Sequence, residues 1–383
     1  MGYYFRNSVR ALVASVALIA TGSATAKQLS AVELQEVLEP LRADWEMPGL
    51  RAAVRYPGGR IVRAAVGLAD IEREIALDDD VPMPGGSVGK TFVAGVALSL
   101  IEEGVLTLDD PISKWVGDTE WFARLPNRDT MQVKHLLSHT SGMGDYPGKV
   151  RFLASMVWRV LHHGSAYFTP EELIFMGARK SAPYAPGEGY EYSDSGYLVL
   201  GRVIEAATGH EYFDLLSDRI LVPLKLEGVV LQDQAILPGV PPGYQRGVST
   251  QREDGSTKLD PSSEWTGGGI ALNPTHLVIY FSALANGRVI SADSFNAMLA
   301  AGFRGQEANE WRYGYGVFVW DGGESFGHEG TWAGYRTIVV QYLKSGITVA
   351  AQTNRDGPIP MWAVVNKIKT LLPALPRRAV PSK

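Results

Sequence analysis

The two ends of the chain carry strand-like patterns, whereas its middle is mainly helical. Near the beginning, apolar residues recur at helical spacing between Leu34 and Leu41, which predicts an amphipathic helix. The segments 50–56 and 60–67 then flank a Pro-Gly-Gly turn, a pattern that is typical of a hairpin. The N-terminal part therefore predicts one helix followed by two strands.

The C-terminal part predicts three strands and a closing helix. Residues 314–320, 335–342 and 347–352 are rich in Val, Tyr, Phe and Ile, which favour strands. Residues 361–372 have a helical pattern. We expect the strands of both ends to form one antiparallel sheet, flanked by the N-terminal and C-terminal helices.

A large, mainly helical region of about 85–310 is expected between the two halves of this sheet. Apolar periodicity predicts helices at 91–103, 197–207 and 275–286. Gly104 and Gly209 are expected to end the first two. We therefore predict a single domain over 27–383, of the α+β class with three α/β/α layers.

The first residues have the order of a secretory signal peptide. Arg6 and Arg10 precede an apolar run over 11–20 and a small-residue stretch that ends at Ala26, as signal peptides do. An uncleaved membrane anchor is the alternative, but the run is shorter than the ~20 apolar residues that span a bilayer. We expect cleavage after Ala26 and a periplasmic or secreted protein.

Composition limits the partners of the chain. With 45% hydrophobic and 20% charged residues, it falls among folded globular proteins. Removing the two arginines of residues 1–26 would change the formal net charge from -5 to -7, which leaves no electrostatic footprint for nucleic acid or anionic lipid. We expect a small-molecule or peptide substrate, no nucleic acid and no stable membrane insertion after cleavage. The absence of cysteine excludes a disulfide framework, and the oligomeric state is left open.

Ser87 and Lys90 are the candidate nucleophile and base. They lie one helical turn apart, at the start of the helix predicted at 91–103, and so share a face. A serine hydroxyl is a weak nucleophile until a base takes its proton, and a lysine can do so when burial or positive potential lowers its pKa. A helix N-terminus supplies such potential, together with free N–H groups for an oxyanion. Ser-x-x-Lys by itself also arises by chance at helix starts.

Tyr192 begins a second motif, Tyr-Ser-Asp, just before the helix at 197–207. A tyrosine hydroxyl held near Ser87 and Lys90 could relay a proton to a leaving group. The alternative is a tyrosine that only packs at a helix start.

The third motif is His328-Glu-Gly330-Thr331-Trp332, which we place on an edge strand beside the site. There His328 could hold a substrate oxygen, Gly330 would let the backbone come close, and the Thr331 N–H could complete an oxyanion hole. Trp332 could line a pocket for the acyl group. The alternative for His328 is a surface histidine without a catalytic role.

With these three motifs in this order, the chain resembles the serine β-lactamase and penicillin-binding-protein superfamily. It is most similar to the class C-like branch, which includes D-aminopeptidases, DD-carboxypeptidases and esterases. The related pattern is Ser-x-x-Lys, Ser-Asp-Asn and Lys-Thr-Gly. The resemblance also rests on residues 104–111, 135–142, 186–187, 196–197 and 334–335. It implies a β-lactamase/transpeptidase-like fold.

The resemblance further implies an acyl-enzyme route that needs no cofactor and no metal. Ser87 would attack a carbonyl, Lys90 and Tyr192 would share the proton traffic, and water or another acceptor would release the acyl group. The N–H groups of Ser87 and Thr331 would form the oxyanion hole, and His328 would face the carboxylate or carbonyl of the substrate.

Two departures from the branch bear on the substrate. Asp194 stands where asparagine is common, and its carboxylate would attract the Lys90 ammonium and raise the lysine pKa. It could instead contact a cationic amine of the substrate or cap the following helix. His328 replaces a lysine, so the permanent positive charge that would hold a β-lactam carboxylate is missing.

These departures favour a D-alanyl-D-alanine carboxypeptidase-like enzyme, a D-amino-acid peptidase or a carboxylesterase. A β-lactamase is one alternative, and a non-catalytic penicillin-binding sensor or scaffold is another. The choice among them stays open at this point, because function lies in the site and not in the fold.

Overall fold

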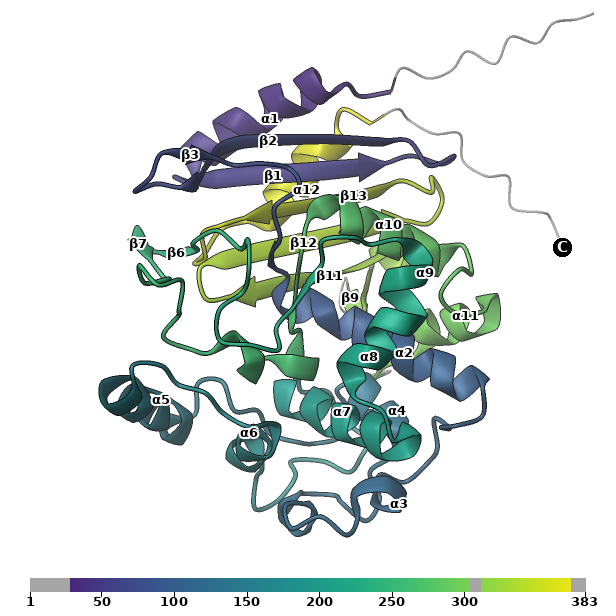
Figure 1. The fold of residues 1–383 in the computed structure, drawn as a ribbon. Coiled ribbons are helices and arrows are strands. Elements are labelled where there is room, and N and C mark those ends of the chain that lie inside the picture. Colours follow the sequence, from purple (N-terminus) through teal and green to yellow (C-terminus); the bar gives the residue numbers. More distant parts are fainter. Residues whose placement is uncertain (1–27, 304–310, 373–383) are drawn as a thin grey trace, which may run out of the picture.

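An antiparallel sheet lies between two helical layers in the computed structural model, which describes residues 28–303 and 311–372 (Figure 1). Within these residues the sheet has eight strands, in the order β3-β2-β1-β13-β12-β11-β10-β9. The two ends of the chain meet where β1 pairs with β13, with Ala52 opposite Ala351. The strands are β1 Gly49–Arg55, β2 Ile61–Asp70, β3 Ile75–Ala76, β9 Trp311–Tyr313, β10 Phe318–Trp320, β11 Ser325–Trp332, β12 Tyr335–Tyr342 and β13 Thr348–Thr353.

Two helices, α1 (Ala31–Asp44) and α12 (Met361–Lys369), cover one face of the sheet (Figure 1). α1 begins with a capping box, in which Ser30 and Glu33 satisfy each other's backbone N–H groups. The apolar faces of both helices pack with the strands in one buried cluster. This is the flanking pair of helices that the sequence predicts.

The other face of the sheet is covered by α10 (Pro274–Ala285), and a helical region packs beyond it around α2 (Gly89–Glu102). α2 runs through the middle of this region and is buried along most of its length. Around it lie α3 Ser113–Val116, α4 Val133–Leu137, α5 Val150–His163, α6 Pro170–Gly177, α7 Asp194–Thr208, α8 Tyr212–Leu216, α9 Val222–Leu224 and α11 Ala292–Ala300.

Short strands inside the helical region fix the segments on either side of the candidate site. β4 (Met83–Pro84) and β5 (Val230–Leu231) both pair with β8 (Ile270–Leu272). The chain therefore enters the turn at Ser87 from β4. After the turn η5 (Trp265–Gly267) it continues into β8, which pairs with β4. A separate hairpin is formed by β6 (Tyr244–Gln245) and β7 (Val248–Ser249).

The predicted three-layer α+β architecture is confirmed. Along the sequence, the helical region lies between the strands that form the two halves of the sheet. Gly104 and Gly209 follow the ends of α2 and α7 with positive φ angles, as expected of helix-ending glycines. The strand predicted at 314–320 is wrong in its first half. There the Gly314 N–H donates to the Val317 carbonyl at 2.8 Å, which makes a turn between β9 and β10.

The expected signal peptide at 1–26, with its cleavage after Ala26, lies outside the described residues. Among the helices of 28–303 and 311–372, none is both long enough and apolar enough to cross a membrane. Localisation therefore stays a prediction from the N-terminal sequence.

Arg51 of β1 ties the sheet to the segment that leads to Ser87. Its side chain is fully buried and donates to the carbonyls of Asp78 at 3.0 Å and Val81 at 2.6 Å and to the Gln352 side chain at 2.8 Å. Burial lowers the pKa of Arg51 to about 9, although nearby aspartates raise it. Because a buried cation needs such partners, this residue fixes the loop in front of β4.

The variant Arg51→Ala should lose roughly 3 kcal/mol or more of unfolding free energy, because it leaves buried carbonyls and Gln352 without donors. Urea denaturation measures this loss. The control is Arg63→Ala on β2, whose ion pair with Asp80 is exposed and should be worth less than about 1 kcal/mol. Equal losses in the two variants would contradict the anchoring role of Arg51.

Candidate active site

Ser87 lies in a tight turn, η1 (Gly86–Val88), that leads directly into α2. Gly86 has a φ of +54°, and a side chain there would come within 2.7 Å of the Thr331 backbone nitrogen and oxygen. Only glycine fits such a position, and η1 therefore lies directly against β11. Ser87 is half-buried, and its Oγ accepts a hydrogen bond from Lys90 Nζ at 3.2 Å.

Lys90 carries a fully buried ammonium group. It donates to the Gly267 carbonyl and forms an ion pair with Asp194 in the first turn of α7. Burial alone would lower the pKa of Lys90, but the Asp194 carboxylate, with help from Tyr192 and Glu264, outweighs burial and raises it. The resting site therefore holds a charged lysine, as the charge of Asp194 predicts.

Two more carboxyl groups surround this ion pair. Glu264 is 6% exposed, and its burial and the charge of Asp194 raise its pKa to about 8, although Lys90 lowers it. Asp145 accepts a hydrogen bond from the Ser195 N–H at 3.1 Å, and burial together with Asp194 raises its pKa to about 7. One ammonium thus faces three carboxyl groups, two of which are held toward their neutral form.

The hydroxyl of Tyr192 is buried next to Ser87 and Lys90. It makes no hydrogen bond of good geometry within the described part of the chain, and the ammonium of Lys90 lies 5.1 Å from the centre of the tyrosine ring. Burial raises the pKa of Tyr192 to about 12, although Lys90 and Ser87 lower it. The phenol is therefore protonated at neutral pH and suited to donate a proton.

His139 holds the Tyr192 segment in place. Its ring centre lies 4.1 Å from that of Tyr192, and its Nδ1 accepts from the Ser193 N–H at 3.1 Å. Burial and the charge of Lys90 keep the pKa of His139 well below its ordinary value, so the ring is neutral and can accept. Ser193 itself caps α7, which removes the capping alternative for Asp194.

The third motif lies on β11. The sequence predicts an edge strand here, but β11 lies inside the sheet order, with β10 and β9 beyond it. β10 pairs with β11 at residues 325–327, and only the half that carries 328–332 has no described partner strand on that side. A side chain at Gly330 would come within 1.9 Å of the Gly85 carbonyl oxygen. The backbone of Thr331 therefore lies beside the turn that holds Ser87, as an oxyanion-hole donor must.

His328 lies behind the site, and both of its ring nitrogens already have partners. Its Nε2 is 2.9 Å from the Tyr313 hydroxyl and its Nδ1 is 2.5 Å from the Glu329 carbonyl oxygen. Burial lowers the pKa of His328 to about 3, so the ring is neutral. A direct contact between His328 and the substrate stays a prediction. In the structure the His328 ring supports Tyr313, and the Tyr313 ring contacts the Tyr192 ring edge-on.

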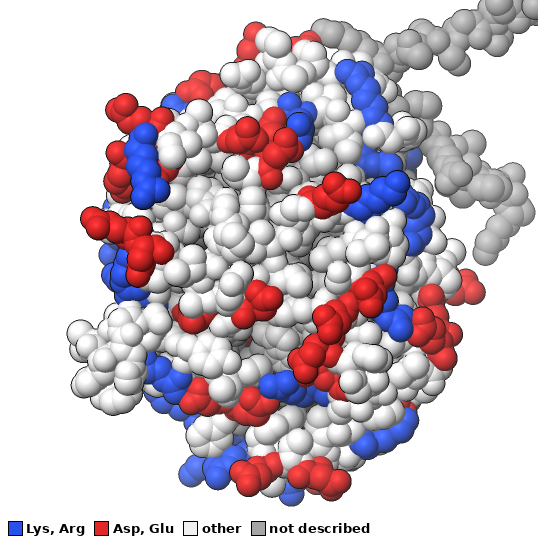
Figure 2. All heavy atoms as spheres, viewed as in Figure 1, with Lys and Arg blue, Asp and Glu red and all other residues white. Residues whose placement is uncertain are grey.

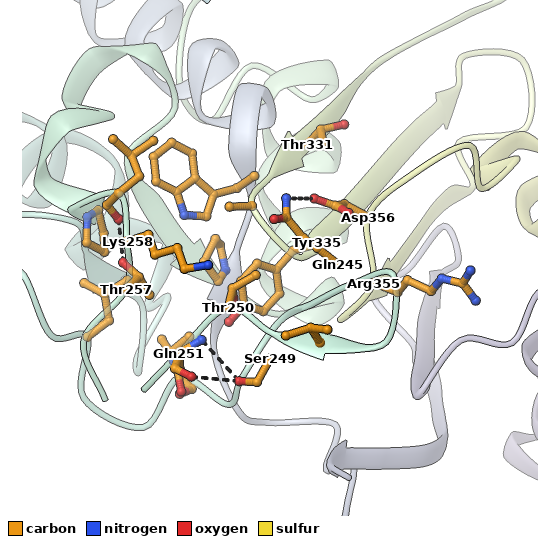
Figure 3. A pocket seen from close by; sticks show the side chains of 18 of the residues that line it. Gln245, Ser249, Thr250, Gln251, Thr257, Lys258, Thr331, Tyr335, Arg355 and Asp356 are labelled. Atoms are coloured by element: carbon orange, nitrogen blue, oxygen red, sulfur yellow. Dashed lines mark hydrogen bonds between the residues drawn. The ribbon is translucent and has the colours of Figure 1, made fainter. Parts of the chain in front are cut away.

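A pocket of about 980 Å³ opens beside Thr331 and Trp332 (Figure 3). The Lys258 side chain extends into it, whereas Arg355 points away (Figure 3) and donates to backbone carbonyls of the segment after α1. Ser87 does not line this pocket, which adjoins the nucleophile. Its apolar lining includes Pro84, Met156, Leu237, Val240, Leu259 and Tyr335.

The structure brings most of the predicted site residues together. Ser87, Lys90, Tyr192 and Asp194 form one cluster, with the backbone of Gly330 and Thr331 against it and Trp332 in the adjoining pocket. Across 28–303 and 311–372, no group of three or more acidic or histidine side chains is placed to hold a metal ion.

The sequence did not single out Asp145 or Glu264, which are two of 41 acidic residues and stand at no regular spacing from Lys90. His139 did carry a signal, because it belongs to the segment 135–142 on which the family resemblance rests.

This fold and this site define a serine hydrolase. A family model described as Beta-lactamase matches residues 34–372, and the chain therefore belongs to the Beta-lactamase family. Penicillin-binding protein 4 of Amycolatopsis lactamdurans is 26% identical over 341 residues, which cover 84% of each chain. Esterase EstB of Burkholderia gladioli is 30% identical over 209 residues, which cover 51% of this chain and 50% of that protein.

A solved structure with the same fold is the D-stereospecific amidohydrolase from Streptomyces sp. It matches with a TM-score of 0.75 at 26% identity and covers 88% of this chain and 98% of its own. D-Amino acid amidase from Ochrobactrum anthropi SV3 matches with a TM-score of 0.71 at 23% identity and covers 88% and 98%. These structures share the antiparallel sheet and helical layers described above.

The acidic cluster should make stability depend on pH through Glu264. Its pKa is about 8 when folded against an ordinary value of 4.5, so folding favours the protonated form. The stabilisation is complete below about pH 4.5 and is lost as the pH rises toward 8. In Glu264→Gln this loss is absent, so the melting temperature of the variant should rise relative to wild type between pH 5 and 8.

Differential scanning fluorimetry across this pH range measures the effect. Glu253→Gln, in an exposed loop, is the control and should follow the wild type at every pH. A parallel pH dependence of Glu264→Gln and wild type would show that Glu264 is already ionised at neutral pH.

Proposed function

We propose that Ser87 forms an acyl-enzyme with amide or ester substrates. The observation that carries this proposal is the contact of 3.2 Å between Ser87 Oγ and Lys90 Nζ, made at a helix start with a buried cation. A serine without a catalytic role has no need of a fully buried lysine one turn away, because burying that charge costs several kcal/mol. The Beta-lactamase family match over 34–372 supports the same conclusion.

The chemistry would proceed in two halves. Ser87 Oγ attacks the substrate carbonyl carbon and gives up its proton, while the N–H groups of Ser87 and Thr331 hold the developing oxyanion. The leaving amine or alcohol takes a proton, for which the Tyr192 phenol is the suited donor, and departs. The base that took the Ser87 proton passes it on to the Tyr192 phenolate. Water then attacks the acyl-serine and gives a proton to the same base, which returns it to Ser87 Oγ as the carboxylic acid product leaves.

Asp194 determines when Lys90 can accept the proton of Ser87. Because the Asp194 carboxylate raises the pKa of Lys90, the resting lysine is charged and cannot accept the Ser87 proton. Lys90 must first lose a proton, either to a carboxyl group of the cluster that has ionised as the pH rises or to solvent once substrate binding has displaced Asp194 from the ion pair. Either route makes acylation faster as the pH rises.

We propose amides, peptides or esters of D-amino acids as the substrate class. Support comes from the similarity to a D-stereospecific amidohydrolase over 88% of the chain and to a D-aminopeptidase at 26% identity over 213 residues. Penicillins and cephalosporins are less suited, since a β-lactam carboxylate needs a cation and His328 is neutral. A carboxylesterase is the nearest variant, because the same acyl-enzyme forms from an ester.

Ser87→Ala should abolish labelling by a fluorescent penicillin and reduce turnover of p-nitrophenyl esters and D-alanyl amides by at least ~1,000-fold. The control is Ser99→Ala, a serine of the same helix that donates to the Val96 carbonyl and accepts from Arg219, outside the Ser87 cluster. D-Alanyl amides should be hydrolysed faster than their L-isomers. Equal rates for wild type and Ser87→Ala would contradict the proposal, and acylation without release of product would favour a penicillin-binding sensor.

Asp194→Asn should move the acidic limb of the pH profile of kcat/KM to lower pH by about one unit or more, because the carboxylate no longer stabilises the charged lysine. Initial rates with a p-nitrophenyl ester across the pH range measure this shift. Asp293→Asn, also an aspartate in the first turn of a helix, should leave the profile unchanged. An unshifted limb in Asp194→Asn would mean that neither Lys90 nor Tyr192 titrates in acylation.

A further inference from the structure

Helix α5 presents apolar side chains to solvent along one face. The exposed fraction of the residue lies between 44% and 82% for Val150, Leu153, Val157, Trp158 and Leu161. Their spacing of three and four residues places them on one side of the helix. These five residues are called the α5 surface below.

The α5 surface points away from the protein core. Phe152, on the opposite side of the helix, is buried and its ring packs against Phe168 at 5.2 Å. α5 forms a corner of the molecule at the lower left of Figure 1, and this corner appears in Figure 2 as a continuous uncharged surface with basic side chains beside it. No described residue covers the exposed side.

The chain segment that carries α5 has charged side chains of one sign only. Between residues 146 and 170 the chain has no Asp or Glu and has three cations, Lys149, Arg151 and Arg159. Arg159 is paired with Glu172, whereas Arg151 donates to backbone carbonyls at the end of α6 and has no ion-pair partner in the described part of the chain. Two histidines end the helix. An apolar stripe with tryptophan, flanked by cations, is the pattern of helices that lie in a membrane interface.

The dimensions of the α5 surface argue for a bilayer over a second copy of the chain. A helix of 14 residues is about 21 Å long and about 10 Å wide, so its exposed side offers roughly 200 Å². A stable protein interface needs about 800 Å² on each partner. A bilayer needs neither this area nor a complementary shape, and anionic headgroups complement the flanking cations.

We propose that the α5 surface docks on anionic lipid bilayers. The helix would lie in the plane of the interface, with Trp158 and Leu161 among the acyl chains and Lys149 and Arg151 at the headgroups. Met156 of the same helix lines the pocket beside Thr331, so docking would hold this pocket close to the membrane. The inference does not depend on the proposed hydrolase chemistry.

Flotation of the full-length protein with vesicles tests this proposal. Vesicles of phosphatidylglycerol and phosphatidylcholine in equal parts should bind wild type, and pure phosphatidylcholine should bind it more weakly. The double variant Trp158→Ser and Leu161→Ser should lower the partition coefficient on the anionic vesicles by roughly tenfold or more, because two apolar side chains no longer enter the lipid. Val32→Ser, an exposed valine of the first turn of α1, is the matched control and should bind as wild type does.

Hydrolysis of a soluble ester by the same preparations shows that each variant is folded, since no residue of the α5 surface contacts the Ser87 cluster. Absence of binding by wild type, or equal binding by wild type and the double variant, would overturn the proposal. So would a dimer in analytical ultracentrifugation that the double variant converts to monomers, because the occupant would then be a second copy of the chain.

Discussion

The buried ammonium of Lys90 is the constraint on which the site depends. Moving such a charge out of water costs several kcal/mol unless other groups replace its hydration. Here the replacements come from distant parts of the sequence: the Asp194 carboxylate from α7 and the Gly267 carbonyl from η5. Lys90 can be buried only when these segments have closed around α2. Formation of the site is therefore tied to formation of the helical layer, and short strands such as β4 and β8 hold the two turns that meet there.

The excess of acid around Lys90 gives the site its protonation state. One ammonium cannot neutralise three neighbouring carboxylates, so the surroundings keep Glu264 and Asp145 close to their neutral forms. A proton can then pass between Lys90 and Glu264 without bringing a new charge into the interior. The close contact between the backbones of Gly86 and β11 would hold the proposed oxyanion donors in place during this transfer.

Features carried by local pattern could be predicted from the sequence, and features made by tertiary contact could not. Helix geometry alone puts Ser87 and Lys90 on one face, and the charge of Asp194 alone predicts its attraction to Lys90. The sequence predicts one strand at 314–320, although the first residues of this segment form the turn between β9 and β10, because aromatic residues on both sides mask the turn at Gly314. Asp145 and Glu264 acquire their roles only when folding brings them to Lys90. The hydrogen bond that occupies Nε2 of His328 likewise depends on Tyr313 from another strand.

Whole-chain averages also conceal local properties such as those of α5. The formal charge of -5 sums 36 basic and 41 acidic residues, which are interspersed over the face in Figure 2. A charged surface acts over about one Debye length, roughly 8 Å in physiological salt, so an approaching ligand responds to the composition of one segment. Residues 146–170 depart from the average because they contain no acid. The sign of the net charge therefore does not decide which surfaces the protein can bind. The cluster at Lys90 is shielded from the α5 surface and keeps its own electrostatic balance.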